Sequence, residues 1–113
     1  MTQLNVTLTA FDEQIWILHL TGTVDSSTHR LMWSADSSTL LAQQLVEAKA
    51  KTLIVELTDV ERIDSQGLGI ILNAYKEFSS HNIDIILRNP NPHLFRLFRL
   101  MQFDQVFTIE FSE

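Results

Sequence analysis

The segment from Lys51 to Phe78 constrains the fold more than any other part of the chain, because a strand in it leads directly into a helix. Leu53, Ile54 and Val55 form a continuous apolar run, which predicts a central strand that is covered on both faces. After a turn, an amphipathic helix is expected from about Gln66 to Phe78. A buried strand followed by a helix indicates a layered fold in which helices pack against a sheet.

The other segments continue this alternation of strands and helices. Two segments with alternating apolar residues, separated by a short turn, predict a hairpin at the start of the chain. The expected strands are residues 4–11, 15–22, 83–89 and 106–111, and further helices are expected within residues 36–50 and 90–103. In the order β-β-α-β-α-β-α-β, these elements predict one α/β domain over residues 1–113, with a mixed central sheet that is parallel in its later part.

Two apolar stripes are expected to attach the outer helices to the sheet. In the first helix the stripe consists of Leu41, Leu45 and Ala48. In the last helix, which begins near two prolines that suit a first helical turn, the stripe comprises Leu94, Leu97, Phe98 and Met101.

The composition restricts the compartment and the classes of partner. The chain has 113 residues, of which 45% are hydrophobic, and this is enough for a hydrophobic core. It lacks cysteine, which excludes disulfides and cysteine-based zinc sites. Neither an apolar run of about 20 residues nor a basic-then-apolar leader is present, so a cytoplasmic protein without membrane contact is expected. The net charge of -6 argues against nucleic acid as a partner and favours a basic protein surface.

Catalytic and metal-binding interpretations find little support. The four histidines, at positions 19, 29, 81 and 93, are scattered and form no ligand pair, so neither a metal site nor a cofactor is expected. Asp25 and Asp64 follow strands that are expected to lie side by side, and paired carboxylates can transfer protons. Because no nucleophile accompanies them, we expect these aspartates to bind backbone N–H groups instead, and we expect no catalytic residues.

The glycines at positions 67 and 69 invite comparison with phosphate-binding loops. The dinucleotide fingerprint requires a further glycine where the chain has Leu72, and the Gly-Lys-Ser/Thr of nucleoside-triphosphate loops is absent. We therefore expect Gly67 and Gly69 to let the first turn of the helix pack close to the sheet.

Ser65 lies at the expected start of this helix, where its hydroxyl is predicted to cap the helix N-terminus. Such a cap contributes about 1 kcal/mol. The position is also in a strand-to-helix loop, where side chains face solvent, and Gln66, Gly67 and Gly69 leave room for the active site of a partner. The hydroxyl is therefore a candidate site of modification.

Phosphorylation of Ser65 would change charge without large changes of structure. It would add about -1.5 to -2 charge at pH 7. The helix N-terminus favours this anion, whereas the nearby Asp59, Glu61 and Asp64 repel it. The fold is expected to survive, but a partner surface fitted to a neutral hydroxyl would lose affinity.

Three motifs resemble those of the STAS domain of bacterial anti-sigma-factor antagonists. The first is an apolar strand, a short acidic link, and the sequence Asp-Ser-Gln-Gly-Leu-Gly at residues 64–69, which opens a helix. The second, Gly22 to Asp25, is similar to the Gly-x-x-Asp that follows the second strand of the family. The third, Leu87 to Ile109, resembles the end of the domain, so the resemblance covers nearly the whole chain.

The resemblance implies a partner-switching regulator of transcription without enzymatic activity. An anti-sigma factor that is also a serine kinase would bind the chain and phosphorylate Ser65, and the phosphorylated form would be released. A PP2C-type phosphatase would restore the unmodified form. The resemblance assigns Asp25, Ser26, Asp64, Gln66 and Gly67 to the partner-binding surface, and implies a monomer or weak dimer.

Two alternatives and one departure accompany this resemblance. The chain could instead be a scaffold or accessory subunit that works without phosphorylation, or a sensor that binds a small molecule near Gly22 and Gly67. The segment from Ser26 to Ser38 is longer than expected and carries Leu31-Met32-Trp33, which could pack under the first helix or alter the partner surface. Gln66 stands where many members have serine or threonine, so a second acceptor is absent.

Overall fold

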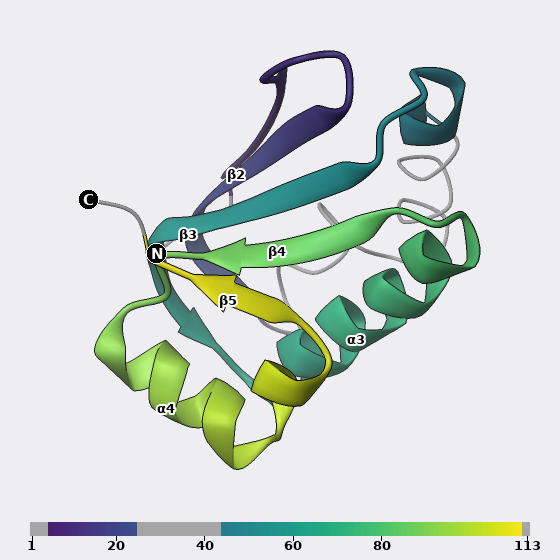
Figure 1. Ribbon diagram of the computed structural model, residues 1–113. Coiled ribbons are helices and arrows are strands. Elements are labelled where there is room, and N and C mark those ends of the chain that lie inside the picture. Colours follow the sequence, from purple (N-terminus) through teal and green to yellow (C-terminus); the bar gives the residue numbers. More distant parts are fainter. Residues whose placement is uncertain (1–4, 25–43, 112–113) are drawn as a thin grey trace.

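The computed structural model describes residues 5–24 and 44–111, and the expectations for Asp25, Ser26 and the segment up to Ser38 lie outside these ranges. Within them, the elements occur in the predicted order (Figure 1). The strands are β1 (Asn5–Ala10), β2 (Ile15–Val24), β3 (Thr52–Ile63), β4 (Asp84–Arg88) and β5 (Thr108–Glu110), and the helices are α3 (Ser65–Ser80), α4 (Pro92–Leu100) and the 3-10 helix η1 (Phe103–Gln105). Residues 44–47 are also helical.

The five strands form one mixed sheet in the order β1-β2-β3-β4-β5. β1 pairs antiparallel with β2, and every later pair is parallel, which confirms the predicted topology. The hairpin turn between β1 and β2 is closed by Asp12, whose Oδ1 accepts hydrogen bonds from the backbone N–H groups of Gln14 and Ile15 at 2.7 and 2.8 Å. An aspartate that accepts bonds from the next residues is typical of tight turns.

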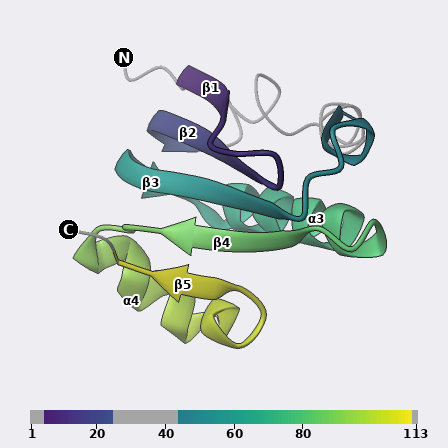
Figure 2. The same cartoon turned by 45° about the horizontal axis from the view of Figure 1, so that its top comes forward.

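The hydrophobic core lies between the sheet and the helices. Leu53 and Val55 of β3 belong to the same core cluster as Phe78 of α3 and Phe98 of α4. Figure 1 shows α3 and α4 on the same side of the sheet, and Figure 2 shows this arrangement from a second direction. The helices in the described ranges therefore cover the face of β3 that carries Leu53 and Val55.

The other face of β3 carries both apolar and polar side chains. Ile54 is almost fully buried there but lies outside the main core cluster. Next to it, a row of polar residues runs in register across the five strands, comprising Thr7, His19, Glu56, Arg88 and Glu110. Leu53, Ile54 and Val55 are all buried, and successive side chains of a strand point to opposite faces, so the prediction that β3 is covered on both faces is confirmed for these residues.

The two predicted apolar stripes are confirmed in part. Leu94 and Phe98 of α4 are buried and Leu97 is half-buried, but Met101 is exposed because α4 ends at Leu100. Of the first stripe, Leu45 is buried, Ala48 is exposed in a turn, and Leu41 lies outside the described ranges. No helix in residues 5–24 and 44–111 is long and apolar enough to span a bilayer.

Gly22 sits at an irregularity in the pairing between β2 and β3. The register shifts between Gly22 and Thr23, and Gly22 has a φ of 112°, a conformation that L-amino acids rarely adopt. The extra residue on β3 bends that strand as it approaches Ser65. The backbone conformation thus requires the glycine of the Gly-x-x-Asp motif.

Gly22→Ala is expected to lower the free energy of unfolding by about 1–3 kcal/mol, since a residue with a Cβ would be held in a strained conformation. Urea unfolding followed by circular dichroism would measure this change. An unchanged midpoint would mean that the backbone at Gly22 relaxes without cost.

Candidate functional site at the start of helix α3

The second half of β3 carries the chain beyond the rest of the sheet. The pairing of β3 with β4 ends at Glu56 and Arg88, whereas its pairing with β2 continues to Ile63, which lies opposite Val24. Ser65 begins α3 two residues later. The last residues of β2 and β3, Val24 and Ile63, are therefore paired directly before Asp64, whereas Asp25 lies outside the described residues.

Asp64, not Ser65, caps α3. Its Oδ1 accepts a hydrogen bond of 2.8 Å from the backbone N–H of Gly67, and its backbone is extended, with φ -89° and ψ -178°. Ser65 is the first residue of the helix. The prediction that the hydroxyl of Ser65 caps the helix is therefore wrong, because pairing with β2 keeps the chain extended through Ile63 and the first free residue takes the cap position. The expectation that Asp64 binds a backbone N–H group is confirmed.

The first turn of α3 presents Ser65 and Gln66 to solvent. Both are exposed, whereas Gly67 and Leu68 are buried beneath them. Within the described residues, the backbone N–H groups of Ser65 and Gln66 have no hydrogen-bond partner, and α3 has no acidic side chain in its first turn. Such a helix start offers hydrogen-bond donors and a partial positive charge to an anion on the hydroxyl of Ser65.

Gly69 is not needed for packing. It is exposed, and a Cβ placed on it would have no atom within 4 Å. The expectation that both glycines bring the helix close to the sheet therefore fails for Gly69. What the glycine provides is an unoccupied surface one turn away from Ser65.

Gly69→Ala is expected to stabilise the protein by about 0.5–1 kcal/mol, because alanine lowers the entropy lost on forming a helix and meets no obstacle. If a partner contacts the surface at Gly69, the added methyl group weakens binding of that partner, although the variant unfolds at a higher urea concentration. Parallel measurement of the urea midpoint and of partner affinity separates the two effects. A Gly69→Ala variant that is less stable than the wild type would contradict the conclusion that a Cβ at this position meets no other atom.

Asn91 connects α4 to the strand before Ser65, a contact to which no sequence motif pointed. Its Oδ1 accepts a hydrogen bond from the backbone N–H of Leu94 at 2.8 Å and so caps α4. Its Nδ2 lies 3.2 Å from the carbonyl oxygen of Val60 and 3.4 Å from that of Glu61. One side chain therefore holds both α4 and the last part of β3. An asparagine before a proline could have indicated the cap, but not the contact with β3.

A partly buried ion pair joins β3 to β4 at the point where the pairing of the two strands ends. Arg88 Nε donates to Glu56 Oε1 at 2.8 Å, and the hydroxyl of Thr58 donates to Oε2 at 3.0 Å. Asn89 Nδ2 lies 3.3 Å from the same Oε2. Burial raises the pKa of Glu56, but the hydrogen bonds from Arg88, Thr58 and Asn89 outweigh this effect, so its pKa lies below the ordinary value. The only sequence signal for this pair was a glutamate within an apolar run.

The three acidic residues near Ser65 in the sequence differ in whether their carboxylates have an ion-pair partner. Asp59 Oδ2 lies 2.9 Å from His19 Nε2 on the neighbouring strand β2, so its carboxylate is engaged there. Glu61 and Asp64 are exposed and form no ion pair with another described residue. The described residues contain no group of histidine, aspartate and glutamate side chains that could hold a metal ion.

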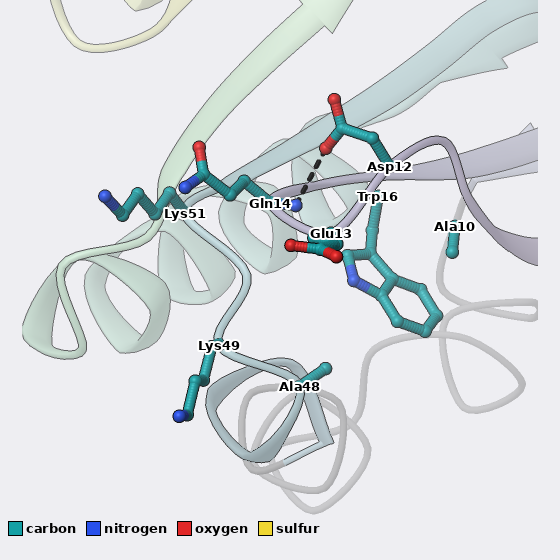
Figure 3. A pocket seen from close by; sticks show the side chains of 8 residues that line it. All are labelled: Ala10, Asp12, Glu13, Gln14, Trp16, Ala48, Lys49 and Lys51. Carbon is teal, nitrogen blue, oxygen red and sulfur yellow. Dashed lines mark hydrogen bonds between the residues drawn. The ribbon is translucent and has the colours of Figure 1, made fainter.

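An open cavity of about 730 Å³ lies at the other end of the sheet (Figure 3). It is formed by the hairpin turn and the segment before β3, and it is lined by Ala10, Asp12, Glu13, Gln14, Trp16, Ala48, Lys49 and Lys51. Gln14 and Lys51 directly precede β2 and β3, whereas Ser65 follows the other end of β3. Neither Gly22 nor Gly67 lines this cavity.

The sequence and the fold are similar to known proteins. The family model of the STAS domain matches residues 8–113. The anti-sigma-B factor antagonists of Listeria monocytogenes serovar 1/2a and Listeria innocua serovar 6a are each 31% identical over 58 residues, which is 51% of this chain and 51% of each relative. The chain thus spans about half the length of these curated relatives.

Solved structures share the fold at lower identity. The Bacillus cell fate determinant SpoIIAA in its phosphorylated form has a TM-score of 0.70 and 16% identity, over 96% of this chain and 92% of that chain. An anti-sigma factor antagonist from Mycobacterium paratuberculosis has a TM-score of 0.67 and 18% identity, over 96% and 86% of the two chains. With the family match over residues 8–113, the chain belongs to the STAS domain family.

Proposed function

We propose that this chain is an anti-sigma-factor antagonist that acts by binding and is switched at Ser65. In its unmodified form it binds an anti-sigma factor that is also a serine kinase. Phosphorylation of Ser65 by that kinase releases it, and a PP2C-type phosphatase restores the binding form. The chain itself carries no catalytic residue and needs no metal or cofactor, and it acts in the cytoplasm as a monomer or weak dimer.

The observation that carries this proposal is that Ser65 is exposed at a helix start that another residue caps. Because the Oδ1 of Asp64 occupies the capping position, the hydroxyl of Ser65 is not needed to hold α3. A phosphoryl group on Ser65 would therefore leave the cap in place. The hydroxyl is free for chemistry that the fold does not depend on.

The energetics of the phosphorylated form favour release over unfolding. The helix N-terminus stabilises an anion by about 0.3–1 kcal/mol at an exposed site, and the exposed Glu61 and Asp64 repel it. The attraction by the helix N-terminus and the repulsion by the two carboxylates oppose each other, so phosphorylation changes the stability of the fold little. A partner that covers Ser65 would instead have to desolvate a dianion, which costs several kcal/mol unless a cation compensates it.

The proposed binding surface surrounds Ser65 on the first turn of α3. Gln66 is exposed beside it, and the buried Gly67 donates its backbone N–H to Asp64. Asp25 and Ser26, which lie outside the described residues, are proposed to contact the partner as well, as the resemblance to the family motif implies. Gln66 cannot be phosphorylated, so Ser65 is the acceptor at this turn.

The direct test is to incubate the purified chain with its cognate anti-sigma factor kinase and ATP, and to map the modified residue by mass spectrometry. The expected result is one phosphate on Ser65 and none on a Ser65→Ala variant. The proposal fails if a kinase of proven activity modifies a different residue or leaves the chain unmodified.

A further inference from the structure

The outer face of α4 has a basic and apolar surface that the proposed switch does not use. Five residues of this helix line a shallow groove of about 450 Å³, namely Pro92, Phe95, Arg96, Arg99 and Leu100. We call it the α4 groove. Leu100 is 74% exposed, whereas the opposite side of the helix buries Leu94 and Phe98 in the core. The groove therefore faces outward and is not part of the hydrophobic core.

The two arginines of the α4 groove lack acidic partners among the described residues. α4 contains no aspartate or glutamate, and neither Arg96 nor Arg99 is in an ion pair with a described carboxylate. The whole chain has a net charge of -6, so carboxylates are abundant elsewhere. Arg99 lies in the last turn, where a cation stabilises the helix dipole, but this effect does not account for Arg96 in the middle of the helix.

The aromatic floor of the α4 groove is held in place by its neighbours. The ring of Phe95 meets that of Phe111 edge to face, with centroids 5.2 Å apart, and the guanidinium of Arg99 lies 5.8 Å from the centroid of Phe95. Phe111 is itself 60% exposed. A preformed aromatic surface beside arginine is characteristic of protein interfaces, in which aromatic residues and arginine are enriched.

We propose that the α4 groove docks an acidic segment of a partner protein that carries an apolar anchor residue. Carboxylates of the segment pair with Arg96 and Arg99, whose planar guanidinium groups bind carboxylates bidentately. The anchor residue covers Phe95 beside Leu100. A short segment contacts only the groove, whereas the net charge of -6 would repel a nucleic acid or an anionic membrane that approaches the rest of the molecule. This docking does not depend on the proposed switch at Ser65.

The test is an NMR titration of the isotopically labelled chain with a short synthetic peptide that contains several glutamates and one tryptophan. The expected shift changes are centred on Phe95, Arg96 and Arg99, and they weaken with added salt. Replacing the glutamates by glutamine removes the same ion pairs from the peptide side and lowers the affinity about tenfold. In an Arg96→Gln/Arg99→Gln double variant the affinity falls about tenfold, as for two exposed ion pairs.

Controls separate the groove from general charge effects. Lys76→Gln removes a positive charge from an exposed site on α3 and is expected to leave peptide affinity unchanged. The proposal is overturned if the peptide does not bind, if it binds the double variant and the wild type equally, or if the glutamine peptide binds as well. The chain is also tested with anionic phospholipid vesicles and with duplex DNA. If it binds either of these more tightly than the peptide, and the double variant does not, the proposal of an acidic peptide ligand is overturned in favour of the lipid or the DNA. A Ser65→Glu variant is expected to bind the peptide like the wild type.

Discussion

Ser65→Glu is expected to weaken binding to the anti-sigma factor kinase by about 100-fold or more, while Ser65→Ala binds as tightly as the wild type and is never released. The glutamate places a charge where the partner covers a neutral hydroxyl, and a cost of about 2.7 kcal/mol corresponds to 100-fold in affinity. The fold of either variant is expected to stay intact, because the cap on α3 comes from Asp64. Titration calorimetry with the purified kinase would measure both affinities.

Ser79→Glu is the matched control for charge at a distance from the site. Ser79 is an exposed serine near the far end of the same helix, so the variant adds the same charge away from the first turn. Its affinity for the kinase is expected to equal that of the wild type. Equal binding by Ser65→Ala and Ser65→Glu would instead favour a scaffold that works without phosphorylation.

Glu56→Gln is expected to destabilise the protein by about 2–3 kcal/mol. The substitution leaves Arg88 without its carboxylate in a site where the two side chains are only 12% and 22% exposed. Loss of one partner from a fully buried pair costs about 3–5 kcal/mol. Water still reaches part of both side chains here, so we expect a smaller loss of stability. Thermal or urea unfolding would measure the loss, and Glu47→Gln, on an exposed helical residue, provides the control.

The same ion pair predicts how stability depends on pH. Because the pKa of Glu56 is lower in the folded state than in the unfolded state, its contribution is complete above the ordinary glutamate pKa of about 4.3. The contribution is lost as the pH falls below this value and through the lower pKa of the folded state. The Glu56→Gln variant should therefore lose less stability than the wild type between neutral and strongly acidic pH. Parallel losses in both proteins would show that Glu56 does not contribute in this way.

The succession of strands and helices could be predicted because it depends on local patterns. The alternation in β2 and the helical spacing in α3 and α4 are properties of neighbouring residues, and the boundaries differ from the predictions by a few residues. β5 is shorter than expected at its start, because the backbone N–H groups of Val106 and Phe107 bond to the carbonyl oxygen of Phe103 and continue the turn of η1. Met101 fell outside the buried stripe for a similar reason, because α4 ends one residue earlier.

The place of Ser65 in the fold was predicted correctly, but the residue that caps its helix was not. The motif placed Ser65 at the start of a helix and on the surface, as the structure has it. Serine and aspartate are both good capping residues, so sequence preference could not choose between Asp64 and Ser65. The choice follows from the pairing of Ile63 with β2, which involves a residue far away in the sequence.

The sequence by itself determined the order of the elements, the parallel later sheet, and the exposed serine at a helix start, because short-range periodicity and helix-start motifs encode all three. Only the tertiary structure decided that Asp64 caps α3 and that Glu56 pairs with Arg88. It also decided that Asn91 ties α4 to the strand before Ser65. The contacts of Glu56 and Asn91 join residues that are more than 30 positions apart, and the choice of Asp64 as the cap depends on the pairing of Ile63 with Val24. Contacts between residues so distant leave no periodic pattern in the sequence.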